Sequence, residues 1–136
     1  MPNIIFSSLL VGTGGFAGSV ARYGLSLVSQ RLHFTWPFGT LSSNVIGCLI
    51  IGSVMALSER GGMLTPEARL TLATGFCGGF TTMSSMIYEV AAMLRAQEYF
   101  SATVYGCGTL ALSMGAFFAG SMLVRLLYKF GGGVWS

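Results

Sequence analysis

Polar side chains recur at helical spacing inside segments of this chain that are otherwise apolar. Thr40 and Asn44 are four residues apart, and so are successive members of the set Tyr105, Thr109 and Ser113. Residues four apart lie above one another on one face of a helix, so each set would form a polar file. Hydroxyl and amide groups in such files can donate hydrogen bonds to an ion that passes between helices. The alternative for any single Ser or Thr is a hydrogen bond to a carbonyl of its own helix.

A third file combines hydroxyl groups with a carboxyl group. Thr82, Ser85 and Glu89 would share one stripe of a helix. Met83 and Met86 would share the neighbouring stripe. Polar groups within a membrane are costly, and they usually line a pathway or join helices. Three files on three helices therefore favour a lined path for a solute.

The charged residues indicate that this solute is an anion. Arg22 lies within an apolar segment, and arginine stays charged in proteins. Glu89 lies near the end of its segment, and no apolar segment carries an acidic residue in its middle. A path with hydrogen-bond donors and an arginine, without a central carboxylate, suits an anion better than a cation. The alternative for Arg22 is a side chain that extends to the membrane surface.

The composition is that of an integral membrane protein. The 136 residues are 53% hydrophobic and 8% charged, whereas about a quarter of the residues are charged in soluble domains. Four apolar segments, at 4–28, 38–57, 66–95 and 99–124, are long enough to cross a bilayer, which takes about 20 residues. We therefore expect an all-α integral membrane protein with four transmembrane helices, in a single membrane domain over residues 1–136.

The third segment contains the sequence 75-GFCGGFTTMSSM-86, which is rich in glycine and hydroxyl groups. Gly78 and Gly79 predict a break in this helix at mid-membrane, because glycine adopts backbone angles that other residues resist. Irregular backbone at that depth is tolerated only where it is buried in protein or lines a cavity. Carbonyl groups that a break exposes can coordinate an alkali cation. The alternative is a mild kink in which Ser and Thr satisfy the freed backbone groups.

Basic residues differ little in number between the two sides of the membrane. The side of the termini carries Arg60, Arg69, Arg125 and Lys129, and the opposite side carries Arg31 and Arg95. The positive-inside rule therefore gives only a weak preference for one orientation. Insertion in both orientations, and hence an antiparallel dual-topology homodimer, is compatible with this pattern. A single orientation with cytoplasmic termini is the alternative.

The motif 75-GFCGGFTT-82, followed by Ser84 and Glu89, resembles the third-helix signature of the Fluc (CrcB) fluoride channels. The sequences 13-TGGFAGSVARY-23 and 37-PFGTLSSNVIGCLIIG-52 resemble the first and second helices of the same family, so the resemblance covers nearly the whole chain. It implies a fluoride-selective channel of a bacterial inner (plasma) membrane that exports fluoride passively and relieves its toxicity. It also implies an antiparallel homodimer in contact with membrane lipid, without a nucleic-acid partner.

The resemblance gives roles to residues at matching positions. It implies a structural Na⁺ at the dimer interface, held by the main-chain carbonyls of Gly78 and Thr81 of each subunit. It implies that Asn44 lies on the pore wall and that Arg22 lies near a vestibule. The residues expected along the fluoride pathway are Arg22, Thr40, Asn44, Met83, Ser85, Met86, Glu89, Tyr105, Thr109 and Ser113.

Met83 and Met86 occupy two positions at which the family carries phenylalanine. The ring edges of those phenylalanines are thought to coordinate fluoride through the positive rim of the aromatic quadrupole. This departure concerns the rate of conduction and not the fold. Thr109 also stands where serine is more usual, and it keeps the hydroxyl group.

The main alternative function is a small dual-topology multidrug/proton antiporter. Such a protein needs a membrane-embedded carboxylate. The first two segments have none, and the candidate, Glu89, lies near the end of the third segment. A purely structural assembly subunit is a third possibility, although it would not need aligned polar files. An enzyme is not expected, because the single histidine, His33, has no cysteine or carboxylate partner nearby.

Overall fold

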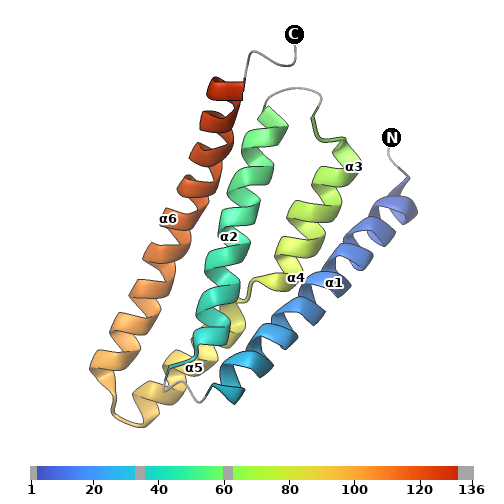
Figure 1. The fold of residues 1–136 in the computed structure, drawn as a ribbon. Helices are drawn as coiled ribbons and strands as arrows, with labels where there is room; N and C mark the ends of the chain where they lie inside the picture. The colour runs from blue at the N-terminus through green and yellow to red at the C-terminus, as the bar shows by residue number, and fades with distance from the viewer. Residues whose placement is uncertain (1–2, 33–35, 60–62, 132–136) are drawn as a thin grey trace.

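The computed structural model describes residues 3–32, 36–59 and 63–131, which form helices joined by short turns, without a strand in these ranges. Three helices are continuous: α1 (Ile4–Arg31), α2 (Phe38–Glu59) and α6 (Tyr99–Gly131). The remaining segment is divided into α3 (Pro66–Arg69), the π-helix η1 (Leu70–Cys77), α4 (Gly78–Phe80) and α5 (Met83–Arg95). Figure 1 shows these pieces following one another beside α2, with α5 displaced from the axis of α4. The four predicted segments are thus helical and the third one is broken, as predicted.

The three continuous helices are each long and apolar enough to cross a membrane. Their outward faces carry exposed large apolar side chains, such as Phe16 on α1 and Phe118 on α6. An exposed apolar surface of this extent suits lipid or a partner subunit rather than water. The chain is therefore a multi-pass membrane protein. That all 136 residues form one membrane domain stays a prediction.

Threonine residues start two helices of the broken segment. The Thr65 hydroxyl accepts a hydrogen bond from Ala68 N at 3.1 Å, and Pro66 occupies the first turn of α3. The Thr82 hydroxyl accepts a hydrogen bond from Ser85 N at 3.2 Å at the start of α5. The second threonine of the Thr-Thr pair therefore begins a new helix rather than continuing the previous one.

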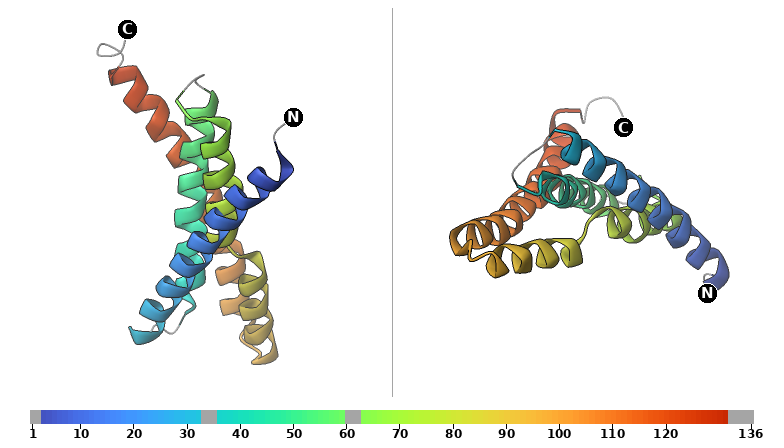
Figure 2. Two further views of the ribbon diagram at one scale, coloured as in Figure 1. Left: turned by 90° about the vertical axis from the view of Figure 1, so that its right-hand side faces the viewer. Right: turned by 90° about the horizontal axis from the view of Figure 1, so that it is seen from below.

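Glycines on both helices form the crossing between α1 and the broken segment (Figure 2). A Cβ atom on Gly18 would overlap the Phe76 carbonyl, and one on Gly79 would overlap the Gly15 carbonyl. Helices in lipid gain stability from this close backbone approach, which only small residues allow. The crossing fixes α1 against the part of the chain that precedes the break.

The break lies at Thr81 and Thr82, and not at the two glycines that were predicted to cause it. Thr81 (φ −81°, ψ 154°) and Thr82 (φ −151°, ψ 109°) are extended, whereas Gly78 (φ −62°, ψ −37°) is helical. The prediction for Gly78 and Gly79 was therefore wrong about the cause of the break. Gly79 is needed instead for close packing against α1, and the extended conformation follows from hydrogen bonds that Thr82 makes with α2.

Candidate functional site

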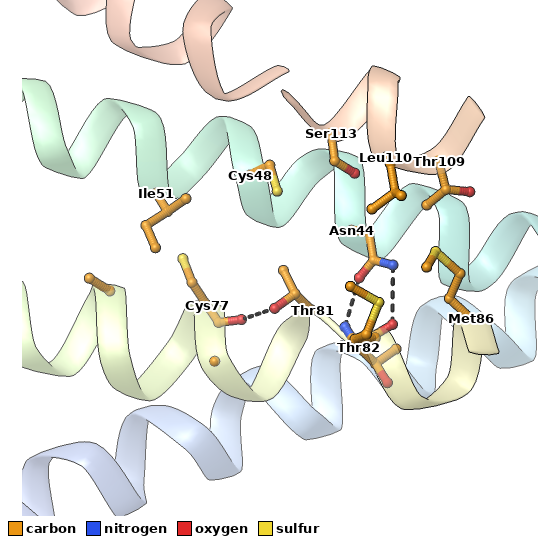
Figure 3. Close-up of a pocket in the computed structure, with 13 residues that line it drawn as sticks. Asn44, Cys48, Ile51, Cys77, Thr81, Thr82, Met86, Thr109, Leu110 and Ser113 are labelled. Carbon is orange, nitrogen blue, oxygen red and sulfur yellow. Dashed lines mark hydrogen bonds between the residues drawn. The ribbon is translucent and has the colours of Figure 1, made fainter. Parts of the chain in front are cut away.

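A pocket of about 300 Å³ lies where the break meets α2 and α6 (Figure 3). The predicted site residues on its wall are Asn44, Gly78, Thr81, Met83, Met86, Thr109 and Ser113. Thr82, which the sequence placed in a polar file but not among the pathway residues, also lines the wall, and the remaining wall residues are Cys48, Ile51, Ala73, Cys77 and Leu110. The wall carries no charged side chain. It therefore offers hydroxyl, amide, carbonyl and sulfur groups in otherwise apolar surroundings.

The side-chain amide of Asn44 pairs with the backbone of Thr82 in the break. Asn44 Nδ2 donates to the Thr82 carbonyl at 3.2 Å, and Asn44 Oδ1 accepts from Thr82 N at 2.7 Å. The pairing satisfies both backbone groups of a residue that has left the helical pattern. Asn44 therefore holds the break in addition to lining the pocket, and its amide has a second N–H for another acceptor.

The same rearrangement frees two carbonyl oxygens. In an unbroken helix, Thr82 N would donate to the Gly78 carbonyl, but it donates to Asn44 Oδ1 instead. Ser85 N would likewise donate to the Thr81 carbonyl, but it donates to the Thr82 hydroxyl. Within the described part of the chain, no hydrogen bond replaces the one that either carbonyl lost. Gly78 and Thr81 both lie on the pocket wall, and their carbonyl groups are the ones that the break leaves without a helical donor.

Arg22 caps the end of the helix that precedes the break. Its Nε donates to the Gly79 carbonyl at 3.1 Å, and the Ser19 hydroxyl approaches the same oxygen at 3.5 Å. The guanidinium charge lies at the negative end of the helix dipole, where a cation is favourable. Arg22 does not lie on the pocket wall, and its predicted position near a vestibule stays a prediction.

Glu89 is held by hydroxyl groups from two other helices. Thr40 Oγ1 donates to Glu89 Oε1 at 2.7 Å, and the Tyr105 hydroxyl donates to Oε2 at 2.6 Å. Thr40 and Tyr105 are buried, and the Trp36 ring packs edge-on against the Tyr105 ring with centroids 6.4 Å apart. These polar residues form a cluster that joins α2, α5 and α6 beside the pocket rather than on its wall.

The polar file on α6 divides between two environments. Tyr105 belongs to the Glu89 cluster, and Thr109 Oγ1 donates to the Tyr105 carbonyl of its own helix at 2.7 Å. The buried Ser113 hydroxyl has no hydrogen-bond partner among the residues that the structure describes. On α5, the Ser85 hydroxyl accepts from the Thr82 hydroxyl at 3.0 Å and stands off the pocket wall. Ser113 is therefore the hydroxyl on the wall that is free to bind a solute.

The two methionines differ in their surroundings. Met86 is 4% exposed and lies in the interior between α5 and α6, where Figure 3 shows it on the pocket wall. Met83 also lines the pocket but is 59% exposed. The side chain of Met83 therefore stands at the rim of the pocket, at the outer surface of the subunit.

Two residues discussed from the sequence, His33 and Arg60, lie outside the described residues. Within the described ranges, no group of three or more His, Cys, Asp or Glu side chains could hold a metal ion. The groups that could hold a hard cation at the break are main-chain carbonyls, as the freed oxygens of Gly78 and Thr81 illustrate.

The family model and the similar proteins both match most of the chain and agree on its family. The family model described as "CrcB-like protein, Camphor Resistance (CrcB)" matches residues 9–121. A protein named "Fluoride-specific ion channel FluC" from Chlorobium phaeobacteroides (strain BS1) is 44% identical over 126 residues, which cover 93% of this chain and 98% of that protein. The FluC of Chlorobaculum tepidum is 45% identical over 118 residues, covering 87% of this chain and 94% of that protein. The family match includes every residue of the pocket wall, and the chain belongs to the CrcB family.

Proposed function

We propose that this chain is the subunit of a fluoride channel through which fluoride leaves a bacterial cell passively across the inner membrane. The observation that carries the proposal is the Ser113 hydroxyl, which is buried without a partner on the wall of an uncharged pocket. A buried polar group is costly without a hydrogen bond, so a small hydrogen-bond acceptor would fit there. The names of the relatives, fluoride-specific ion channels, support fluoride as that acceptor.

The proposed path runs along the pocket. It passes the second N–H of Asn44, the Ser113 hydroxyl and the side chains of Met83 and Met86. Thr109 lines the same wall, although its hydroxyl is used by its own helix. The cluster of Thr40, Glu89 and Tyr105 lies beside this path, and Arg22 and Ser85 support the break.

A second copy of the chain completes this site in our proposal. Met83 is largely exposed although it lines the pocket, so a partner placed against it would close the rim. The near balance of basic residues between the membrane sides suits an antiparallel arrangement of the two copies. Lipid would cover the remaining apolar faces of α1 and α6.

A structural Na⁺ at the dimer interface fits the carbonyl groups at the break. Gly78 and Thr81 would each supply a main-chain oxygen from each subunit, and both oxygens have lost their helical donors. Uncharged oxygen ligands of this kind suit a hard cation such as Na⁺. When bound, the ion would hold the two breaks together and supply positive charge near the anion path.

The multidrug/proton antiporter is the less favoured function. Such a mechanism requires a carboxylate that exchanges protons in contact with the transported cation. The Glu89 carboxylate is instead engaged by two hydroxyl groups, and it does not lie on the pocket wall.

Efflux from liposomes tests the proposal directly. Protein reconstituted in liposomes loaded with fluoride or chloride should release fluoride, measured with an ion-selective electrode, and should retain chloride. Equal release of both anions would contradict fluoride selectivity, and drug uptake driven by a proton gradient would support the antiporter.

A further inference from the structure

The pocket that contains the proposed anion path is also rich in sulfur. Cys48, Cys77, Met83 and Met86 all lie on its wall. Figure 3 shows Cys48 on α2 and Cys77 at the end of η1 on opposite sides of the same space, with Met86 further along it. Thiol and thioether groups from three separate segments therefore converge on one pocket.

The chemistry of these groups selects one class of ligand. Thiolate and thioether sulfurs are soft donors that favour Cu(I) and related soft metal ions over Mg²⁺ or Ca²⁺. A zinc site is not supported, because the described residues offer no group of three or more His, Cys, Asp or Glu side chains. Two of the four sulfurs belong to methionine, which remains neutral when it binds a metal.

The charge balance favours a monovalent cation in this apolar pocket. One cysteine would release its proton to solvent as its sulfur binds the metal, so that one thiolate and one monovalent cation give a neutral pair. The second thiol and a methionine thioether could complete the coordination without adding charge. A divalent cation would be neutralised only if both cysteines lost their protons, and placing two thiolates and a doubly charged ion in these apolar surroundings costs more than placing one thiolate and a monovalent ion.

We infer that this pocket binds a soft monovalent cation, Cu(I) or Ag(I), through Cys48 and Cys77 with thioether support from Met86 or Met83. The binding itself does not depend on the proposed function. A consequence that does rest on it is that the bound ion blocks fluoride, because it occupies the same pocket as Asn44 and Ser113. The chain would then be a fluoride channel that closes when a thiophilic metal is present.

The test uses Ag⁺ and two matched variants in nitrate buffers, since silver chloride is insoluble. Cys107→Ser removes the exposed thiol, which lies outside this pocket, and keeps both pocket thiols. The second variant adds Cys48→Ser and Cys77→Ala, with alanine chosen because Cys77 is buried. Each protein is incubated with Ag⁺, unbound metal is removed by gel filtration, and silver per subunit is measured by mass spectrometry.

We expect Cys107→Ser to retain one silver ion per subunit and to lose most of its fluoride efflux on Ag⁺ treatment. The triple variant should retain no silver, and its efflux should not respond to Ag⁺. Equal silver retention by the two variants would overturn the site. If the Cys107→Ser protein retains silver and its fluoride efflux does not change, the silver site stands and the block is wrong. If the protein retains silver but passes no fluoride even before Ag⁺ is added, the proposed channel function is contradicted instead. If the triple variant does not elute as folded protein, two separate variants in the Cys107→Ser background replace it, one with Cys48→Ser and one with Met86→Leu. Silver retention that is unchanged in both of these variants would overturn the site.

Discussion

The side-chain amide of Asn44 binds both backbone polar groups of Thr82, with distances of 3.2 Å to the carbonyl and 2.7 Å to the amide nitrogen. This contact joins α2 to the extended residues of the break, 38 positions further along the chain. Thr82 cannot satisfy the same groups within a helix while it remains extended. The break is therefore stabilised by a residue of another helix rather than by its own glycines.

Replacement of Asn44 should lower stability as well as transport. In Asn44→Ala, the amide and carbonyl of Thr82 lose their partners in a buried place, and an unsatisfied buried group costs about 1–3 kcal/mol. We expect a lower thermal midpoint in detergent and little fluoride efflux. Asn44→Asp should also be destabilised, because a carboxylate would face the Thr82 carbonyl.

Ser42→Ala is the control for a substitution elsewhere on α2. Within the described residues, the Ser42 side chain makes no hydrogen bond, whereas its neighbours Ser43 and Asn44 do. Its midpoint should equal that of the unmodified protein. An Asn44→Ala protein that melts at the same temperature would show that the pairing with Thr82 does not stabilise the break.

Arg22 should matter through its contact with Gly79. Hydrogen bonds from charged donors contribute about 1.5–3 kcal/mol, so Arg22→Gln should lower the thermal midpoint measurably. Arg22→Lys keeps the charge but lacks the planar donor group, and should recover only part of the loss. Ser19→Ala removes a much longer contact to the same carbonyl, at 3.5 Å, and should have little effect. Equal midpoints for Arg22→Gln and Ser19→Ala would refute the capping role.

Ser113 offers a way to separate transport from stability. Its buried hydroxyl makes no hydrogen bond within the described chain, so Ser113→Ala should leave the thermal midpoint unchanged or slightly higher. If the hydroxyl donates to fluoride in the pocket, the same variant should reduce fluoride efflux. Ser58→Ala is the matched control, because the Ser58 hydroxyl donates to the Val54 carbonyl of its own helix, away from the pocket. Equal efflux from both variants would remove Ser113 from the path.

The sequence predicted the helices and the polar faces because these depend on local periodicity. Thr40 and Asn44 do face the broken segment together, through Glu89 and Thr82 respectively. The four segments also begin at the predicted residues, since each follows a proline, a capping residue or a turn.

The position of the break could not be predicted in the same way, because it depends on contacts between distant residues. Gly78 is permissive but is held in a helix, whereas Thr82 is extended because Asn44 offers it a donor and an acceptor. The contact of Arg22 with Gly79 joins residues 57 positions apart, so the local sequence pattern could not predict it either. The different exposure of the Met83 and Met86 side chains depends on the direction that α5 takes after the break.

The end of α5 contains a residue that is unfavourable for its backbone conformation. Gln97 has φ 62°, and the amides of Gln97 and Glu98 close the helix onto the carbonyls of Leu94 and Met93. Helix ends of this type usually carry glycine at that position. We expect Gln97→Gly to stabilise the protein by about 0.5–1 kcal/mol, after allowance for the greater freedom of glycine in the unfolded chain. The thermal midpoint measures the effect. Ala96→Gly is the control, because Ala96 has φ −79° and gains nothing from glycine, and a similar gain there would contradict the argument.

Met83 and Met86 should respond differently to the same substitutions, because one lies at the rim and the other in the interior. Met86 is 4% exposed, so Met86→Ile places a stiff, β-branched side chain in the interior beside the pocket and should reduce both stability and fluoride efflux. Met83 is 59% exposed, so Met83→Ile should leave the stability of the subunit unchanged and act on efflux alone. The double change Met83→Phe and Met86→Phe should conduct faster than the methionine protein, since aromatic edges present an ordered positive rim to the anion. The measurement is fluoride efflux across the Met, Phe and Ile series, with the thermal midpoint and the gel-filtration profile recorded for each protein. If Ile at both positions conducts as well as Met, neither side chain contacts the ion, and the path does not run along this wall of the pocket.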